Sequence, residues 1–146
     1  MYQATGYVLI QHNALVNRLM GNQVIGLFVP RFAGSAHAQA AVAAALDLLR
    51  ATGHADPAGP WIPVGTGVHT GVAYVGRVGE GDACDFTALG DSVNTTARLA
   101  AQAGAGEILV SRAAADASRL DTTGLEARTL TLRGRDETVD ALVATT

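Results

Sequence analysis

The sequence predicts an α+β fold, a mostly antiparallel sheet with helices on one face, and three observations carry this prediction. Two runs rich in β-forming residues, 14–20 and 23–29, flank a Gly-Asn pair typical of tight hairpin turns. An Ala-rich run at 36–52 has the composition of a helix. Two more β-rich runs, 126–132 and 138–144, lie near the C-terminus and predict a strand pair.

The N-terminal third is expected to contain a helix end, the first hairpin and a longer helix. Residues 2–12 space Tyr and Ile loosely at the helical period and are interpreted as the end of a helix. Pro30 is expected to end the second strand, because proline cannot donate to a strand ladder. Ser35 is the predicted N-cap of the helix over 36–52, and Gly53 is predicted to close it.

The middle of the chain is richer in glycine. Residues 54–63 contain several Pro and Gly residues and predict a loop. The Gly-rich runs 64–71 and 72–79 predict a hairpin in which backbones approach closely. A short strand at 86–89 leads to a helix whose predicted N-cap is Asp91. The remaining predicted elements are a strand at 107–111 and a helix at 112–118.

Composition bounds the class of protein. The 146 residues predict one domain over residues 1–146, and 49% apolar against 16% charged residues predicts a folded chain. The net charge of −3 does not indicate the basic surface that nucleic-acid-binding proteins have. No signal peptide is recognisable, the Ala-rich run at 38–49 is too short to span a bilayer, and Cys84 is the only cysteine. We therefore expect a soluble, cytoplasmic protein that does not enter a membrane.

The stretch GDSVNTTARL, residues 90–99, is the candidate binding motif. It predicts a helix that begins after a Gly-Asp turn and carries Asn94 and Arg98 four positions apart. This spacing puts an amide and a guanidinium on one helical face, close enough to contact one ligand. Guanidinium groups bind phosphate oxygens through paired hydrogen bonds. Taken alone, such a pair is more often a solvent-exposed helix face without a ligand, so the surrounding sequence decides its interpretation.

Three stretches together resemble the catalytic domain of class III adenylate and guanylate cyclases: GNQVIGLF, GVHTGVAYVGRVG and DFTALGDSVNTTARLAAQAGAGEILVS. The resemblance runs from about Leu15 to Leu142. It implies a ferredoxin-like βαββαβ core and a head-to-tail dimer with active sites between the subunits. The implied reaction is attack of a ribose 3′-oxygen on the α-phosphate of ATP or GTP, with release of pyrophosphate, assisted by two Mg²⁺ or Mn²⁺ ions.

The resemblance also implies roles for individual residues. Asn94 matches the asparagine that orients the ribose, and Arg98 matches the arginine that contacts the reacting phosphate. Thr87 and Arg18 occupy the two purine-reading positions, where Arg18 replaces the family's lysine. Asn22 occupies a metal-binding position at which the family has aspartate. In the family, one subunit supplies the metal ligands and the other supplies the ribose- and phosphate-binding residues.

The metal half departs from the family pattern. The amide oxygen of Asn22 is a neutral and weaker ligand for a hard divalent cation than a carboxylate. The first carboxylate in the sequence belongs to Asp47, so residues 1–46 contain no acidic side chain, and metal binding by this chain alone is not expected. The family's opening strand, which carries its first metal aspartate, has no counterpart here. Since that strand is central in the family's sheet, we expect two unpaired strand edges, filled by residues 1–12 or by dimerisation.

Three functions are compatible with this pattern. We expect a degenerate cyclase domain that has no cyclase activity as an isolated homodimer. One alternative is an active provider of half a site in a heterodimer whose partner contributes the metal ligands, and another is a non-catalytic nucleotide-binding or regulatory module. The purine-reading positions leave the choice between ATP and GTP open. His69 is interpreted as a strand histidine packed in the sheet rather than as a ligand.

Overall fold

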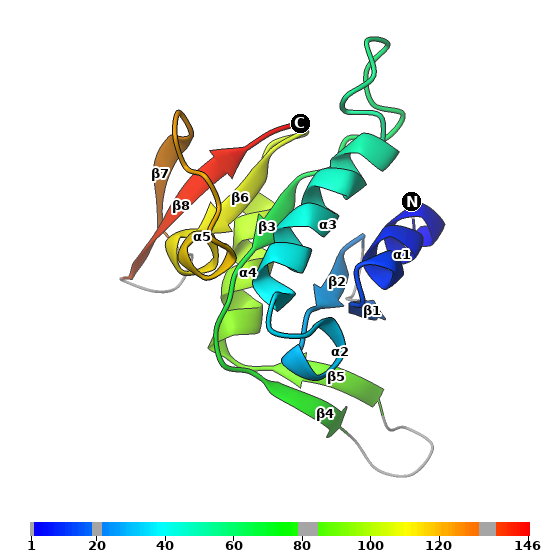
Figure 1. Cartoon of the computed structure of the whole chain (residues 1–146), viewed down its shortest axis with the longest axis vertical. Helices are drawn as coiled ribbons and strands as arrows, with labels where there is room; N and C mark the ends of the chain where they lie inside the picture. Colours follow the sequence, from blue (N-terminus) through cyan, green and yellow to red (C-terminus); the bar gives the residue numbers. More distant parts are fainter. Residues whose placement is uncertain (1, 19–21, 79–84, 132–136) are drawn as a thin grey trace.

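The chain folds around one four-stranded sheet and two separate strand pairs (Figure 1). The computed structural model describes residues 2–18, 22–78, 85–131 and 137–146. The elements in chain order are α1 (Tyr2–Gln11), β1 (Leu15–Arg18), β2 (Val24–Leu27), α2 (Pro30–Ala33), α3 (His37–Ala51), β3 (Thr66–Val68), β4 (Tyr74–Val78), β5 (Asp85–Leu89), α4 (Asp91–Gln102), β6 (Ile108–Ser111), α5 (Arg112–Ser118), β7 (Glu126–Thr131) and β8 (Thr138–Ala144).

The predicted α+β fold class is confirmed, and strand pairing is mostly antiparallel. The four-stranded sheet has the order β3-β6-β8-β7, in which β8 is antiparallel to both neighbours and β3 is parallel to β6. The first predicted strand pair is confirmed as β1 and β2, with Leu15 opposite Leu27. The C-terminal pair is confirmed as β7 and β8. The other pair, β4 and β5, is also antiparallel.

The core lies on both faces of the four-stranded sheet. Ile108 and Val110 of β6 point to the face that α3 and α5 cover, where Leu49 is fully buried. Leu109, between them, points to the opposite face and packs against Leu99 of α4. Because side chains alternate across a strand, a strand covered on both faces is apolar along its length. The prediction that the helices lie on one face is therefore wrong in part: α3 and α5 share one face, and α4 covers the other.

Residues 2–11 form α1, which confirms the helix predicted over 2–12. Leu9 of α1 packs with Ala44 of α3 and with Phe28, which follows β2. At the end of α1, Nε2 of His12 lies 2.8 Å from a carboxylate oxygen of Asp47 in α3. These contacts place α1 beside α3 and β2, so the expectation that this segment fills the gap in the sheet is wrong (Figure 1).

Two local predictions are wrong for identifiable reasons, and one short helix was not predicted. The runs 64–71 and 72–79 do not pair with each other, because β3 pairs with the distant strand β6 and β4 pairs with β5. The N-cap of α3 is Ala36, which makes no side-chain capping bond, so Ser35 is not its cap. A short helix, α2, begins at Pro30, since the fixed φ of proline suits the first helical position.

The C-terminal end of α3 confirms the predicted role of Gly53. This glycine has a φ of 89°, which residues with a side chain rarely adopt. Its N–H donates to the carbonyl oxygen of Arg50, and the N–H of His54 donates to the carbonyl oxygen of Leu49, at 3.0 and 2.9 Å. The two bonds form a Schellman motif, which ends the helix and starts the predicted loop at 54–63.

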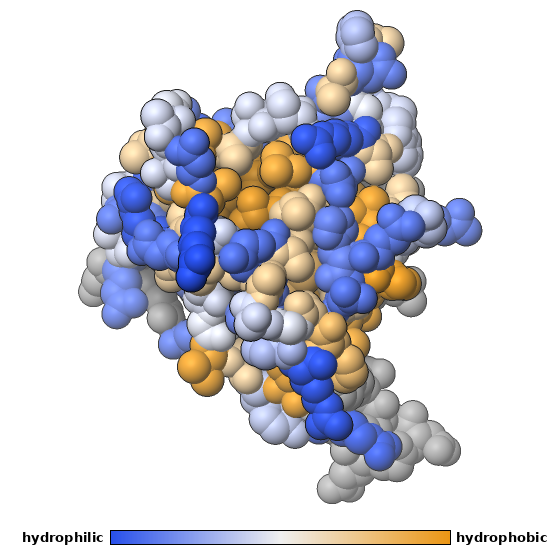
Figure 2. Space-filling model, in the orientation of Figure 1, coloured by the Kyte–Doolittle hydropathy of each residue, from blue (hydrophilic) through white to orange (hydrophobic). Residues whose placement is uncertain are grey.

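The surface is chemically mixed. Figure 2 shows hydrophilic and hydrophobic residues side by side on the face viewed in Figure 1. One exposed apolar group consists of Val72, Tyr74 and Leu89, which are 93%, 57% and 50% exposed. Tyr74 and Leu89 lie opposite each other in the β4–β5 pair, directly before α4. Within the described part of the chain, no helix has the length and hydropathy needed to cross a membrane.

Candidate functional site

A strand–helix junction carries most of the candidate residues. Strand β5 leads into α4 through Gly90, which has φ 134° and ψ 175° and is the N-cap of the helix. The predicted capping role of Asp91 is therefore wrong, because Asp91 is the first residue of the helix. A negative side chain in the first turn interacts favourably with the positive end of the helix dipole. The hydroxyl of Ser92 donates to the carbonyl oxygen of Val72 at 2.9 Å, which ties the first turn of α4 to the segment before β4.

Asn94 and Arg98 lie on one face of α4, one turn apart, as their spacing predicts. Asn94 is exposed and Arg98 is half-buried. A different side of the helix carries Leu99, which is fully buried against the sheet. The described residues give the guanidinium of Arg98 no hydrogen-bond or ion-pair partner. This face can therefore offer an amide and a guanidinium to a ligand from outside the chain.

Two glycines hold α4 close to β3. A Cβ atom on Gly67 would lie 2.5 Å from the backbone nitrogen of Ala100, and one on Gly65 would lie 2.5 Å from the carbonyl oxygen of Ala103. Cβ atoms essentially never approach so closely, so both positions require glycine. The predicted close approach in this Gly-rich run is confirmed, although the neighbour is a helix and not a second strand.

The two purine-reading candidates lie on different strand pairs. Thr87 is in β5 opposite Gly76 of β4, and Arg18 is the last residue of β1 opposite Val24 of β2. The side chains of both candidates lie outside the described residues, so only their backbone positions are described. Thr87 belongs to the strand that leads into α4, whereas Arg18 ends β1, whose partner strand β2 begins two residues after Asn22, the metal-position residue.

Asn22 does not fit a metal-binding role. It lies two residues before β2 and is exposed to solvent, and it offers only an uncharged amide oxygen. In the described ranges, no three His, Cys, Asp or Glu side chains are grouped so that they could hold a metal ion. Mg²⁺ and Mn²⁺ prefer carboxylate oxygens, which this position lacks. No metal-dependent step is therefore assigned to the residues of this chain.

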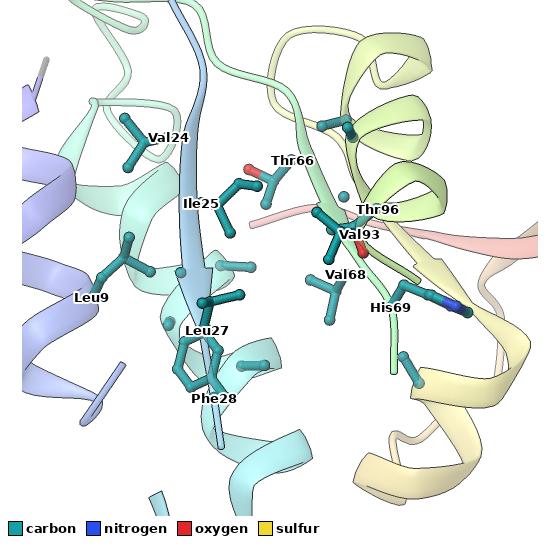
Figure 3. A pocket seen from close by; sticks show the side chains of 18 of the residues that line it. Leu9, Val24, Ile25, Leu27, Phe28, Thr66, Val68, His69, Val93 and Thr96 are labelled. Atoms are coloured by element: carbon teal, nitrogen blue, oxygen red, sulfur yellow. The ribbon is translucent and has the colours of Figure 1, made fainter. Parts of the chain in front are cut away.

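A cavity of about 810 Å³ lies between β2 and β3, bounded by α3 and α4 (Figure 3). Asn22 is among its lining residues, whereas Asn94 and Arg98 are not. Within one chain, the structure thus separates the metal position from the polar face of α4. The sequence analysis predicted two unpaired strand edges but missed the cavity walls, where small residues such as Ala41 and Ala97 leave space. In the sequence, alanines at these positions predict a helix and give no sign that they line a cavity.

His69 lines the same cavity as Asn22, and its imidazole makes a structural contact (Figure 3). It follows β3, and its Nδ1 lies 2.8 Å from the hydroxyl oxygen of Ser111. Ser111 is the N-cap of α5, and its hydroxyl accepts the N–H of Ala114. Burial lowers the pKa of His69. These contacts agree with the interpretation of His69 as a packed histidine, but His69 lies just after β3, so its predicted place within a strand is wrong.

Comparisons with known proteins agree with this architecture. A family model described as "Adenylate and Guanylate cyclase catalytic domain" matches residues 22–142. Among curated proteins, "Adenylate cyclase 1" of Rhizobium meliloti (strain 1021) is 33% identical over 97 residues, which is 63% of this chain and 15% of that protein. This chain therefore spans only a small part of the length of that relative.

Solved structures show the same fold. The crystal structure of the guanylyl cyclase Cya2 superposes with a TM-score of 0.82 at 21% identity, over 97% of this chain and 75% of that one. The adenylyl cyclase CyaB from P. aeruginosa superposes with a TM-score of 0.75 at 21% identity, over 99% of this chain and 79% of that one. At this level of identity the likeness concerns the fold alone.

Proposed function

Because this chain belongs to the family of adenylate and guanylate cyclase catalytic domains, we propose that it is a degenerate cyclase domain that makes no cyclic nucleotide as an isolated homodimer. The family reaction joins the ribose 3′-oxygen of ATP or GTP to the α-phosphate and releases pyrophosphate. Nucleotide substrates and the single Cys84 favour a cytoplasmic location for such a domain.

The observation that carries the proposal is the lack of acidic ligands on the metal side of the site. Residues 1–46 contain no carboxylate, and Asn22 offers a neutral amide at the position of a metal aspartate. Two bound divalent ions activate the attacking oxygen and neutralise the charge of the leaving group, and they need anionic oxygen ligands to remain bound. Without such ligands, the remaining polar groups can bind a nucleotide but cannot drive the displacement.

The test is a cyclic nucleotide assay of the purified chain in Mn²⁺ with ATP and, separately, with GTP. We expect no cyclic AMP or cyclic GMP above the background of a protein-free sample. The Arg98→Ala variant, assayed in parallel, identifies any signal from a contaminating cyclase, because contaminant activity persists in both samples. Turnover by the wild-type chain that disappears in Arg98→Ala would contradict the proposal.

The polar face of α4 favours a second candidate, in which the chain provides half a site to a heterodimer. Asn94 and Arg98 are presented together, away from the cavity, and the described residues leave Arg98 without a partner. A guanidinium there suits a phosphate that gains charge during the reaction, and a neighbouring amide suits a ribose hydroxyl. A second cyclase domain would then contribute the metal ligands.

The apolar group beside this face supports association with another domain. Val72, Tyr74 and Leu89 are exposed where the β4–β5 pair meets the start of α4, only one helical turn before Asn94. Exposed apolar side chains gathered in one place commonly mark a protein contact. A partner seated on this group would lie next to Asn94 and Arg98, where a shared site has to form.

The two candidates are separated by mixing this chain with a cyclase subunit that keeps its two metal aspartates but has lost its own Asn and Arg. Cyclic nucleotide that appears only on mixing, and disappears with Arg98→Ala, supports the second candidate. If the chains associate but stay silent, the half-site candidate is wrong and the degenerate domain acts as a scaffold. Association is measured by sedimentation in the same samples, so lack of contact is not mistaken for lack of catalysis.

A further inference from the structure

The 54–63 loop, which links α3 to β3, has ends that lie close together. Figure 1 shows this loop projecting beyond the end of α3. The backbone N–H of Trp61 donates to the carbonyl oxygen of Thr52 at 3.1 Å, and its indole N–H donates to the carbonyl oxygen of Ala51 at 3.0 Å. Trp61 therefore forms one tie across the neck of the loop, where its two ends meet. Compact surface loops with close ends are frequently functional.

His54 forms a second tie across the same neck. Its Nε2 accepts the backbone N–H of Val64, the residue that follows the loop, at 3.1 Å. The backbone N–H of His54 donates to the carbonyl oxygen of Leu49 at 2.9 Å, which anchors this residue to α3. The imidazole is also packed closely, because a Cβ on Gly106 would lie 3.1 Å from its Nδ1. The half-buried ring of His54 thus joins the end of α3 to the segment that leads into β3.

The second tie requires a neutral imidazole. A ring nitrogen that accepts an N–H carries no proton, so the proton of neutral His54 lies on Nδ1. In an imidazolium both nitrogens are donors, so Nε2–H would face the N–H of Val64 and the bond would be lost. Imidazole is the side chain whose ordinary change of charge falls between about pH 5 and about pH 8. The bonds of Trp61 join N–H donors to carbonyl oxygens, which do not titrate in this range, so only the tie of His54 depends on pH.

The segments around His54 carry three other ionisable side chains. Each is bonded to a different group: Arg50 to Asp47, Asp56 to the N–H of Ala58, and Glu107 to Arg128. In the described structure, none of the three accepts a hydrogen bond from the imidazole. Protonation of His54 therefore breaks the bond to Val64 without supplying an anionic partner in its place.

We propose that His54 is an acid-sensitive clasp of the 54–63 loop. Neutral His54 closes the neck, and protonated His54 releases Val64 and leaves the loop held by Trp61 alone. The sheet and its core remain folded in both states, because the tie lies outside the strand pairings and outside the buried clusters.

The clasp adjoins the end of α4. The carbonyl oxygen of Val64 accepts the N–H of Gly106 at 2.9 Å. The next residue, Gly65, lies so close to Ala103, the C-cap of α4, that an added Cβ would be 2.5 Å from the Ala103 carbonyl oxygen. Release of Val64 therefore acts on the segment that packs against the last turn of α4, the helix that carries the polar face.

NMR of the ¹⁵N-labelled chain tests the clasp directly. Long-range ¹H–¹⁵N correlations at about pH 8 should show the proton of His54 on Nδ1 and none on Nε2. Amide exchange is then measured at about pH 8 and about pH 5, with each rate divided by the rate of an unstructured chain at the same pH. We expect the protection of the Val64 amide to fall at least about fivefold on acidification, the size expected for the loss of one hydrogen bond.

Variants separate the clasp from other effects of acid. His54→Gln keeps an acceptor oxygen that does not titrate, so the protection of Val64 should be the same at both pH values. His54→Ala removes the acceptor and should give low protection at both. His37→Gln changes another half-buried histidine, at the start of α3, and should keep the wild-type response.

The amide of Leu109, in the buried strand β6, reports changes in global stability. Its response to acid should be the same in wild type and in His54→Gln. The proposal would be overturned by a neutral His54 with its proton on Nε2, by protection of Val64 that does not fall between the two pH values, or by an equal fall in His54→Gln. The first two results come from the wild-type chain, so they decide the matter even where a variant fails to fold.

Discussion

Gly67 of β3 and Ala100 of α4 touch backbone to backbone, since a Cβ on Gly67 would lie 2.5 Å from the Ala100 nitrogen. This contact sets the distance between the sheet and the helix that carries Asn94 and Arg98. The helix can therefore hold its polar face in place without a bound ligand, because its position depends on backbone packing and on the buried side chain of Leu99.

Gly67→Ala should destabilise the chain. The added methyl group must push against the backbone of α4, and overpacking of this kind typically costs about 1–3 kcal/mol of unfolding free energy. The matched control is Gly6→Ala in α1, where nothing lies within 4 Å of the added Cβ and the helix should gain ~0.5–1 kcal/mol. Urea unfolding of the three proteins measures both changes, and a Gly67→Ala protein as stable as wild type would contradict the close approach.

Asn22→Asp should not create cyclase activity in the isolated chain. One carboxylate at this position adds an anionic ligand, but two-ion chemistry needs more than a single acidic group, and residues 1–46 supply no other. The assay is cyclic nucleotide formation in Mn²⁺ with ATP or GTP, with Asn22→Ser as the control. A gain of activity in Asn22→Asp alone would show that acidic ligands from elsewhere in the chain reach this position.

Arg98→Ala should lower the rate of an active mixed dimer about 10²–10³-fold, because the guanidinium would stabilise charge that develops on the phosphate. Arg98→Lys keeps the charge but loses the forked geometry, so an intermediate rate is expected. Arg112→Ala removes an exposed arginine from α5 and should leave the rate unchanged. Unfolding of each variant is measured separately, since a loss of rate that follows a loss of stability would point to a structural role.

The stability of the chain should depend on the protonation of His69. Burial lowers the pKa of this imidazole below its ordinary value of 6.5, so the unfolded chain binds more protons than the folded chain between the two values. The contribution of neutral His69 to the free energy of unfolding is therefore fully present above pH 6.5. It is lost as the pH falls through the lowered pKa of His69 in the folded chain. NMR titration should give a midpoint below 6.5, and His69→Gln should remove this part of the pH dependence. A midpoint at or above 6.5 would contradict it.

Local features of the fold are predictable because they depend on neighbouring residues. The strand pair β1–β2 follows from two β-rich runs around a Gly-Asn pair, and the end of α3 follows from Gly53, whose backbone conformation favours glycine. The polar face of α4 follows from the spacing of Asn94 and Arg98 alone. None of these predictions requires knowledge of which distant segments meet.

Long-range pairing is not predictable in the same way. Gly65 and Gly67 indicate that a backbone comes close, but the sequence does not identify it as α4, so the neighbouring run was the natural hairpin partner. The capping prediction for Asp91 fails because Gly90 reaches a φ of 134° that an aspartate rarely adopts. The cavity walls are hidden for a similar reason: alanine is both a strong helix former and the residue that leaves space between elements.

The parallel pairing of β3 with β6 also governs how the chain folds. Thr66 meets Ile108 only after β4, β5 and α4 have been traversed, whereas β7 and β8 meet within one short stretch of chain. Closing a long loop loses entropy before the contact is gained, and such pairings slow folding. We therefore expect the β7–β8 ladder to form before β3 docks against β6.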